Sequence, residues 1–233
     1  MTQAELALRG SPWAGPYRTA YEEGVGAALD ALHRAVAPDT LVCGPSGHAV
    51  ATVGHLAAAR RIWHGGSFLR RSSAVEELQL GAPVLEPLGV VAVRCTVPRP
   101  AVRTSGPPEP PADWPLGLLG LRLGLSERLR DAVIAQLRPR LFGGTPLLQH
   151  QLLRGALADV TIEHLQIHAM LTETQPGRVH LGELHRRIDR ADRTLLRSFG
   201  AAGFLATGPG APAYVSELLG DLHQPRTMPE PDQ

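Results

Sequence analysis

Lysine is absent from this 233-residue chain, so all 23 of its Lys and Arg positions are arginines. The absence excludes Schiff-base chemistry on a lysine and the lysine of a phosphate-binding P-loop. An anionic ligand would have to be held by arginine, by histidine or by backbone N–H groups at a helix N-terminus. The 22 acidic residues nearly balance the basic ones, which argues against nonspecific binding to nucleic acid or to a membrane surface.

Cysteine is scarce, and long apolar runs are missing. The two cysteines, Cys43 and Cys95, are too few for a disulfide framework. No apolar run reaches about 18 residues, so the sequence predicts no membrane-spanning helix. Residues 1–10 lack the basic and apolar regions of a signal peptide. We therefore expect a soluble, cytoplasmic protein.

The first half of the chain has a mixed pattern. Apolar residues recur at helical spacing over 17–36, and a second helix is predicted over 48–63. A short apolar run at 40–43 is followed by Gly-Pro-Ser-Gly. Residues 84–97 are rich in valine and bracketed by prolines, which is typical of a β-strand. The segment 67–80 carries no clear period.

The second half is regularly helical. Apolar periodicity covers 116–138, continues from a helix start at Thr145 until Pro176, returns over 181–199, and ends in a shorter helix over 212–222. Thr145 has the chemistry of an N-cap residue, and Pro146 fits the first helical position. Several amphipathic helices joined by short connections imply a bundle.

These patterns predict a mainly α protein with a small β portion and a C-terminal four-helix bundle. The repeated prolines of 103–115 exclude a helix and mark the clearest linker. The predicted organisation is a reduced N-terminal helical region at 1–80, a short β-like segment at 81–102, the linker at 103–115, the bundle at 116–223 and a disordered tail at 224–233.

Two short motifs border the long helices of the bundle. The first runs from Arg140 through Phe142 to Gln151, and it combines a cation, an aromatic ring and a predicted helix N-terminus. Arginine and free backbone N–H groups are suited to phosphate, and a flat side chain is suited to a nucleobase. The alternative is a helix–loop–helix corner with a solvated arginine.

The second motif contains Arg197, Gly200, Ala201, Gly203 and Phe204. Small residues allow a backbone to approach a ligand closely, and Arg197 is able to meet a phosphate. The alternative is an ordinary helix C-terminus with Gly203 as its cap.

Together the two motifs resemble the C-terminal helical domain of flavin-dependent acyl-CoA dehydrogenases. In that family they grip the adenosine and pyrophosphate half of FAD. Arg140 and Gln151 keep the family's spacing of eleven residues, whereas Phe142 is displaced by one position from the family phenylalanine. In the second motif Arg197 replaces a glutamine, and Ala201 replaces the second glycine. The resemblance covers 116–223 and implies FAD as cofactor, bound by Arg140, Phe142, Gln151, Arg197, Gly200 and Ala201.

The chain departs from the family pattern at the reactive end of the flavin. The family base is a glutamate near the C-terminus, and Glu230, flanked by prolines, is the nearest equivalent. Some members carry the base on the first helix of this domain instead, where only Asp113 is acidic. The middle β-domain of the family is nearly missing from this sequence. The catalytic residues therefore remain unknown.

Two further features of the sequence suggest a binding site but also have a purely structural explanation. His164 and His168 lie four residues apart on a helix, a spacing that binds metals, but no third ligand is evident. We therefore predict no metal site and expect histidines that are solvated or at the edge of the core. Residues 40–48 read as strand, tight turn and helix, which suits a phosphate-binding turn, although a simple turn is the plainer interpretation.

The sequence hypothesis is a flavoprotein related to acyl-CoA dehydrogenases, or one subunit of a heteromeric enzyme. It would act on an acyl-CoA or acyl-carrier-protein thioester with FAD shared across a subunit interface, as a homo-oligomer or with a full-length dehydrogenase paralogue. No nucleic-acid or membrane partner is expected. The alternatives are a non-catalytic scaffold that has lost FAD, and a flavin-free acyl-thioester isomerase or dehydratase.

Overall fold

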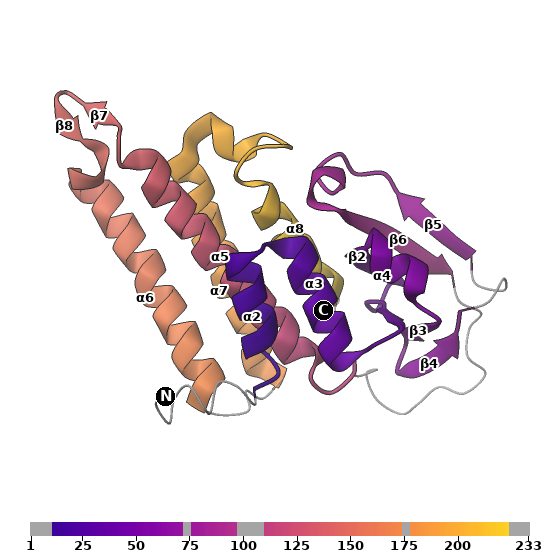
Figure 1. Ribbon diagram of the computed structural model, residues 1–233. Helices are drawn as coiled ribbons and strands as arrows, with labels where there is room; N and C mark the ends of the chain where they lie inside the picture. Colours follow the sequence, from indigo (N-terminus) through magenta and orange to yellow (C-terminus); the bar gives the residue numbers. More distant parts are fainter. Residues whose placement is uncertain (1–10, 72–75, 97–109, 174–177, 224–233) are drawn as a thin grey trace, which may run out of the picture.

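The computed structural model describes residues 11–71, 76–96, 110–173 and 178–223. The protein is mainly helical, with small sheets at one end (Figure 1). The helices are α2 (Ala14–Glu22), α3 (Val25–Val36), α4 (Val53–Ala58), α5 (Trp114–Leu137), α6 (Gln151–Glu173), α7 (Arg178–Phe199) and α8 (Ala211–His223). Short 3₁₀ turns are η1 (Glu86–Leu88), η2 (Leu147–Gln149) and η3 (Gly200–Phe204).

Helix α5 is the centre of the helical body, and α2, α3, α6, α7 and α8 all contact it. Glycines on α5 bring α2 unusually close. A Cβ atom added at Gly120 would lie 2.3 Å from the carbonyl oxygen of Trp13, and one at Gly124 would lie 2.3 Å from that of Tyr17. Elements from both sides of the predicted linker therefore pack into one helical body.

The strands form two small three-stranded sheets. They are β1 (Thr40–Val42), β2 (His48–Thr52), β3 (Arg61–His64), β4 (Ser67–Arg70), β5 (Glu76–Leu80) and β6 (Val90–Thr96). One sheet has the order β1-β3-β4, with β1 parallel to β3, and the other has the order β2-β6-β5 and is antiparallel. Leu41, Ile62 and Val93 belong to one buried cluster that joins the two sheets.

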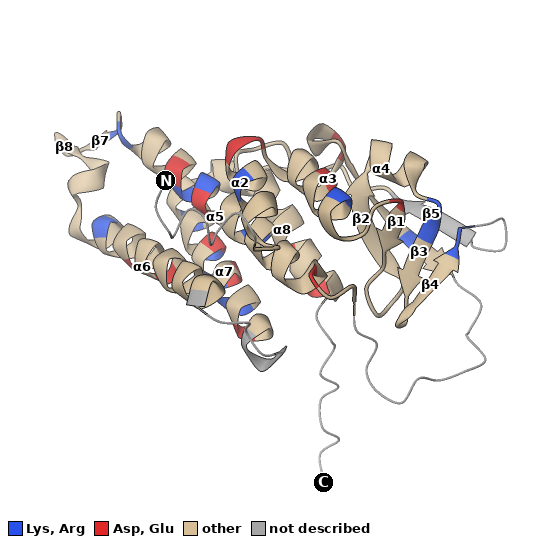
Figure 2. Cartoon of the chain, turned by 60° about the horizontal axis from the view of Figure 1, so that its bottom comes forward, with Lys and Arg blue, Asp and Glu red and all other residues tan. Residues whose placement is uncertain are grey.

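A larger buried cluster attaches the sheets to the helices. It includes Val50 and Val90 from the strands, Leu29 and Leu32 from α3, and Leu118 from α5. Two further clusters lie within the helical body, one between α2, α5, α6 and α7, the other where α5, α6 and α7 meet α8. Acidic and basic residues are interspersed along α5, α6 and α7 (Figure 2).

Two expectations for the first half were wrong. The helix predicted over 17–36 is two helices, because Gly24 adopts φ 99° and separates α2 from α3. The helix predicted over 48–63 is strand β2, the short helix α4 and strand β3. Here strand β2 pairs with β6, about forty residues away in sequence, and Thr52 caps α4 by accepting a hydrogen bond from the His55 N–H at 3.0 Å.

The helix start predicted at Thr145 was also wrong. Strands β7 (Leu141–Phe142) and β8 (Thr145–Pro146) form a hairpin, in which Gly143 and Gly144 have φ of 58° and 81°. Such a turn favours glycine, because other residues are strained at positive φ. Helix α6 therefore begins only at Gln151. The helices predicted over 116–138, 181–199 and 212–222 are confirmed as α5, α7 and α8.

Candidate functional site

The first motif lies on the β7–β8 hairpin and at the beginning of α6, at the end of the helical body far from the sheets (Figure 1). Arg140 precedes the hairpin, and its carbonyl oxygen accepts a hydrogen bond from Leu147 N–H at 2.9 Å, which closes the hairpin onto η2. Phe142 is 71% exposed, and its ring meets His150 edge-to-face with 5.8 Å between centroids. Gln151 is the first residue of α6, whereas the helix start predicted at Thr145 would have placed it about two turns inside the helix.

The second motif lies at the junction of α7 and η3. Arg197 is exposed in the last turn of α7, and Gly200, with φ 65°, begins η3 beside the exposed Ala201. Gly203 is buried, and a Cβ atom there would lie 2.7 Å from the carbonyl oxygen of Leu196. Gly200 and Gly203 are therefore required by the chain's own turn.

The two motifs border the same buried cluster. Leu196, just before the second motif, and Phe199, within it, are members of this cluster. Leu147 and Leu153, on either side of Gln151, pack against it. Within the described residues, the side chains of Arg140 and Arg197 make no hydrogen bond or ion pair with the chain itself. Both motifs thus present arginines to solvent at the rim of one cluster.

A buried polar cluster lies inside the helical body, centred on Arg122 of α5. This side chain is fully buried and donates hydrogen bonds to Ser216 Oγ of α8 at 3.1 Å, to His185 Nδ1 of α7 at 2.8 Å and to a carboxylate oxygen of Asp189. Gly220 gives it room, since a Cβ atom there would lie 2.2 Å from Arg122 Nη1. The arrangement joins three helices through one guanidinium group.

Because Arg122 donates to His185, the histidine must accept with a neutral ring. Burial, with Arg122 as the next cause, lowers the pKa of His185 well below its ordinary value. Burial also raises the pKa of Asp189, and the adjacent Arg122 offsets that rise only in part. The geometry favours a charged Asp189, since an arginine beside a carboxylate stabilises its ionised form.

A second buried group adjoins the first. Ser126 Oγ lies 2.8 Å from His164 Nε2 of α6, and it also hydrogen-bonds Asp192 of α7. Burial raises the pKa of Asp192 to about 7, although Ser126 and Arg122 act in the opposite direction. Burial lowers the pKa of His164 to about 4. Ser126, His164 and Asp192 are at most 5% exposed, so they hold helices together rather than touching a substrate.

The predicted histidine pair on α6 turns towards α5. His168 Nε2 lies 3.1 Å from a carboxylate oxygen of Glu127, and Tyr17 of α2 donates a hydrogen bond to the same carboxylate at 2.8 Å. Burial and the hydrogen bond to Glu127 raise the pKa of Tyr17. In the part of the chain that the structure describes, no group of three or more His, Cys, Asp or Glu side chains is arranged to hold a metal ion.

The sequence contained a signal for the buried cluster that apolar periodicity does not detect. His185, Asp189 and Asp192 recur at helical spacing on α7, on the side that faces α5. Arg122 stands among leucines and glycines on α5. A polar stripe at the period of a helix, opposite a lone arginine, predicts a buried ion pair.

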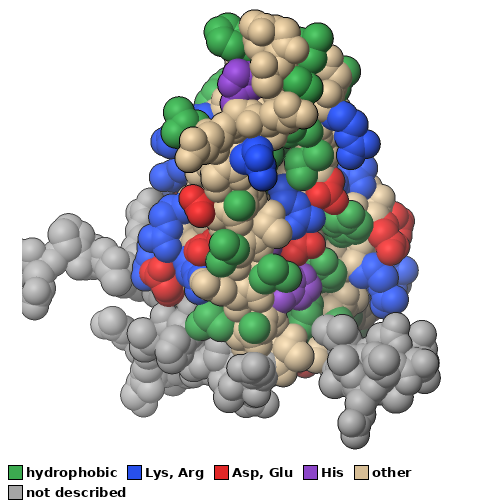
Figure 3. Space-filling model, turned by 90° about the vertical axis from the view of Figure 1, so that its left-hand side faces the viewer, with side chains coloured by type: hydrophobic (Ala, Val, Ile, Leu, Met, Phe, Trp, Pro, Cys, Tyr) green, Lys and Arg blue, Asp and Glu red, His purple; other side chains and the backbone are tan. Residues whose placement is uncertain are grey.

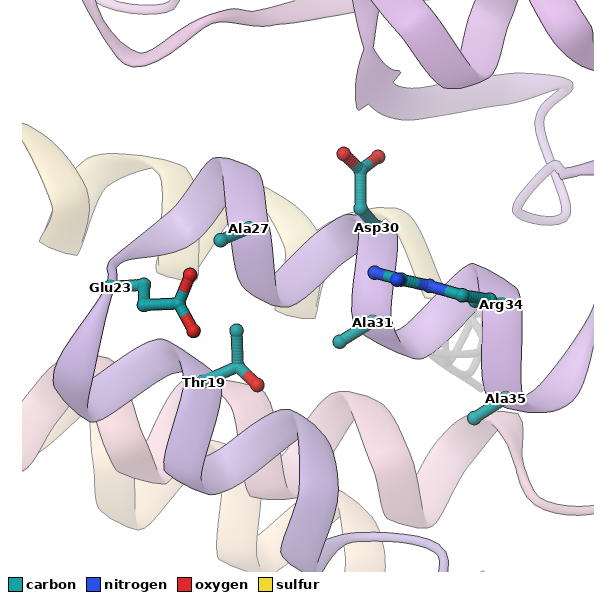
Figure 4. A pocket seen from close by; sticks show the side chains of 7 residues that line it. All are labelled: Thr19, Glu23, Ala27, Asp30, Ala31, Arg34 and Ala35. Carbon is teal, nitrogen blue, oxygen red and sulfur yellow. The ribbon is translucent and has the colours of Figure 1, made fainter.

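Other candidates are less suited to chemistry. The turn at 44–47 joins two strands rather than a strand and a helix. An open groove lies between α2 and α3 (Figure 4), and it lacks the apolar enclosure expected of an acyl pocket. Its lining is Thr19, Glu23, Ala27, Asp30, Ala31, Arg34 and Ala35.

Asp113 is exposed at the start of α5, and Glu230 lies outside the described residues. No helix within those residues combines the length and hydropathy needed to span a bilayer.

No family model matches the sequence, and no curated protein matches it. Solved structures do match. A putative acyl-CoA dehydrogenase from Mycobacterium smegmatis superposes with a TM-score of 0.56 at 12% identity, over 94% of this chain and 83% of that chain. A variant of the Tcur3481-Tcur3483 steroid acyl-CoA dehydrogenase gives 0.54 at 14% identity, over 94% and 75%. A glutaryl-CoA dehydrogenase from Mycobacterium smegmatis, in complex with FADH2, gives 0.51 at 12% identity, over 89% and 70%.

The structural likeness extends beyond the segment that carries the motifs. The motif resemblance covers 116–223, whereas the superpositions include α2, α3 and the sheets as well, because they span about nine-tenths of the chain. Across most of its length, this chain is structurally similar to acyl-CoA dehydrogenases.

Proposed function

We propose that this chain is a flavoprotein of the acyl-CoA dehydrogenase type, or one subunit of a heteromeric enzyme of that type. Its substrate is an acyl-CoA or acyl-carrier-protein thioester, and its cofactor is FAD shared across a subunit interface. Arg140, Phe142, Gln151, Arg197, Gly200 and Ala201 contact the adenosine diphosphate half of that FAD. The observation that carries the proposal is the position of these residues, exposed at the rim of one cluster on a dehydrogenase-like fold.

The residues present fit the adenosine diphosphate half. Arg140 and Arg197 are exposed cations with no partner within the described chain, and pyrophosphate needs such cations. Gln151 opens α6, where the first backbone N–H groups have no partner in the helix and favour an anion. The Phe142 ring, 71% exposed, offers a flat surface for adenine. When bound, FAD supplies the acceptor for a substrate hydride.

We infer that a second subunit holds the reactive end of the flavin. An acyl-CoA dehydrogenase needs a carboxylate beside the substrate α-carbon. Within 110–121 the one acidic residue is Asp113, which is exposed. A full-length paralogue would supply the base, and this chain would supply the phosphate-binding arginines. Such a division explains how a chain without an evident base remains necessary for activity.

Competition between nucleotides tests the proposed contacts directly. We expect FAD and ADP to bind the isolated chain or its complex and to compete with one another, whereas FMN, which lacks the adenosine half, does not compete. Arg140→Ala or Arg197→Ala should weaken FAD binding by about tenfold or more, because each removes a charge-assisted hydrogen bond of about 1.5–3 kcal/mol. Arg190→Ala, at an exposed arginine of α7 that pairs with Glu183, is the control.

Activity in a reconstituted complex provides the second test. We expect Arg140→Ala to abolish dehydrogenation by the complex with a full-length paralogue, while Arg190→Ala retains it. Full activity of Arg140→Ala would refute the assignment. Assembly of a complex without flavin would favour the scaffold alternative, and turnover of an acyl thioester without flavin would favour an isomerase or dehydratase.

A further inference from the structure

The segment from residue 40 to residue 75 contains four arginines and no aspartate or glutamate. The arginines are two adjacent pairs, Arg60–Arg61 and Arg70–Arg71, at the open end of the hairpin formed by β3 and β4. The whole β1-β3-β4 sheet lies within this segment, so the sheet carries cations and no acid of its own. Figure 2 shows basic residues around β3 and β4, at the end of the molecule that holds the sheets.

Two of these arginines face each other across the strand pair. Arg61 of β3 is directly opposite Arg70 of β4 in the antiparallel register, which puts their side chains on the same face with Cα atoms about 5 Å apart. Both are exposed, and neither forms an ion pair with a residue that the structure describes. Like charges directly opposite each other destabilise a sheet, so the fold alone does not explain this pair.

The arginines on the surface of the helical body are placed differently. On α7, a carboxylate oxygen of Glu183 lies 2.8 Å from Arg186, and the other lies 2.9 Å from Arg190. Arg193 of α7 pairs with Glu217 of α8. Figure 3 faces the end of the helical body opposite the sheets, and there acidic and basic side chains lie beside one another. Exposed cations are thus neutralised along α7, whereas those of the sheet are not neutralised by the described residues.

Protection of a sheet edge accounts for one of the two opposed arginines at most. Strand β4 is the last in the order β1-β3-β4, and a charge on an edge strand opposes pairing with another chain. This reason covers Arg70, but Arg61 lies on the central strand. The acid nearest in sequence, Asp39, meets Arg61 through its backbone, because its carbonyl oxygen accepts the Arg61 N–H at 3.0 Å. Within the described residues, the Asp39 carboxylate forms no ion pair.

Arg71 belongs to the fold, whereas the opposed pair is open to a partner. The Arg71 guanidinium donates hydrogen bonds to the carbonyl oxygens of Leu56 and Ala59 at the end of α4. On the other face of the strands, the Arg61 guanidinium lies over the ring of Phe68, with 5.3 Å from Cζ to the ring centroid. Phe68 is 54% exposed. Cations and an aromatic ring therefore share one exposed face.

The composition of this face favours an acidic protein as its partner. Arginine and aromatic side chains are enriched at protein interfaces, and a guanidinium stacked on a ring keeps N–H groups at its edge for a carboxylate. Small ligands usually bind in concave sites, whereas these side chains stand on an exposed strand pair. A long nucleic acid or a membrane would also meet the acidic residues of the helical body, since the net charge of the chain is +1. A small acidic protein avoids that repulsion.

We propose that the face formed by Arg61, Phe68 and Arg70, with Arg60 beside it, docks a small acidic carrier protein that delivers the acyl thioester. This docking rests on the proposed function, in which the acyl group is held by CoA or by a carrier protein. Of the two, the carrier protein suits the face, because its carboxylates pair with the opposed guanidinium groups and remove their repulsion. The unpaired cations also attract such a protein over a distance, so association is fastest at low salt.

An acyl carrier protein without its phosphopantetheine arm tests the docking alone, because it cannot enter an active site. Fluorescence anisotropy of the labelled carrier protein with the full chain should show binding that weakens as ionic strength rises from about 0.05 to about 0.3 M. Arg61→Glu and Arg70→Glu should each raise the dissociation constant about tenfold or more. Arg154→Glu, the same charge change at an exposed arginine of α6, is the control and should bind like the wild type. Absence of binding at low salt, or binding that ignores both sheet substitutions, would overturn the proposal.

Arg70→Glu also separates docking from folding. An opposite charge across from Arg61 should stabilise the strand pair, so this variant should melt at a higher temperature than the wild type while it loses the carrier protein. A lower melting temperature would show that the fold itself requires Arg70, and the proposal would then fail.

Competition distinguishes the carrier protein from other anions. We expect CoA, an oligothymidylate and phosphatidylserine vesicles to leave the carrier protein bound. Displacement by CoA would assign the arginines to nucleotide phosphates, and displacement by the oligothymidylate or the vesicles would assign them to nucleic acid or lipid. Each of these results would overturn the proposal.

FAD binding by the same samples separates the docking from the proposed function. Arg70→Glu should keep the FAD affinity of the wild type, and Arg140→Ala should keep its affinity for the carrier protein. A chain that binds FAD but no carrier protein would overturn the docking and leave the proposed function in place. A chain that binds the carrier protein but no FAD would refute the proposed function and support the docking surface.

Discussion

Helices α6 and α7 have similar lengths, 23 and 22 residues, and they lie side by side, yet their outer sides are opposite in character. The outer side of α7 carries ion pairs, with Glu183 bound to Arg186 and Arg190 and with Arg193 bound to Glu217 of α8. The outer side of α6 carries Ile162 and Leu165. Solvent suits the first surface, and a protein partner suits the second.

The inner sides differ as well. Helix α7 presents His185, Asp189 and Asp192 to the buried cluster around Arg122, whereas α6 presents mainly aliphatic residues. The polar interior of α7 is satisfied largely within one chain, whereas the apolar exterior of α6 is not covered by the residues that the structure describes. One chain therefore completes the interior of α7, whereas the described residues leave the outer side of α6 uncovered.

Removing the centre of the polar interior should have the largest effect. Arg122→Ala leaves the buried His185 and the partly buried Asp189 without their partner, and breaking a buried ion pair costs up to about 3–5 kcal/mol. Urea unfolding should show that loss. Arg186→Ala breaks the exposed ion pair between Arg186 and Glu183 on α7. This change should alter the free energy of unfolding by less than about 1 kcal/mol. Equal effects of the two changes would refute the distinction between the sides of α7.

Two glycines sharpen the contrast between buried and exposed helix surfaces. Gly220→Ala on α8 forces a methyl group against the buried Arg122 guanidinium, so it should destabilise the fold by about 1–3 kcal/mol. Gly155→Ala on the outer side of α6 meets nothing, and it should stabilise the monomer by about 0.5–1 kcal/mol. Thermal unfolding of dilute samples shows whether each variant is less or more stable than the wild type. A change of the melting temperature in the same direction for both variants would contradict the structure.

Buried titratable groups, among them His33 on α3, also make the stability of the fold depend on pH. The pKa of His33 is lowered to about 3 by burial and that of His164 to about 4, so below about pH 6.5 the unfolded chain binds more protons and stability falls. Burial raises the pKa of Asp192 to about 7, so between about pH 4 and 7 the folded state holds its extra proton and stability falls as pH rises. The two contributions oppose each other.

Asp192→Asn should therefore steepen the loss of stability in acid. Removing the proton held by Asp192 adds about 1.4 kcal/mol per pH unit to the slope of the unfolding free energy between about pH 4.5 and 6.5. Urea unfolding at a series of pH values measures the slope. A slope equal to that of the wild type would show that Asp192 is charged throughout this range.

The smallest effect is expected for the apolar exterior of α6 in the monomer. Ile162→Gln changes a half-exposed side chain without breaking a contact of the buried clusters, so the free energy of unfolding at high dilution should change by about 0.5 kcal/mol or less. A loss of several kcal/mol in the monomer would mean that the outer side of α6 is part of the chain's own core.

The long helices could be predicted from sequence because their apolar periods are local. Helices α5, α7 and α8 have the predicted positions within a few residues. The start of α6 could not be placed, because the Gly143–Gly144 turn diverts the preceding residues into a hairpin. Strand β2 was missed because its stability comes from pairing with β6, a partner distant in sequence.

For the candidate site, the sequence supplied the residue types but not their surroundings. It predicted Arg140, Gln151 and Arg197, and the structure gives their exposure and their shared border with one cluster. The Arg122 cluster was not predicted, because its members on α7 are polar and do not contribute to an apolar period. The exposure of Ile162 and Leu165 could not be predicted either, since an outward apolar row resembles an inward one until a neighbouring helix is placed.

The most direct test of the account is a visible absorption spectrum of the purified protein, alone and after coexpression with a full-length dehydrogenase paralogue. We predict a flavin spectrum, with FAD rather than FMN released on denaturation, in the coexpressed complex. Flavin on the chain alone would mean that the contacts within this chain suffice to retain FAD without a second subunit. Colourless protein in both preparations would contradict the central claim that this chain binds FAD.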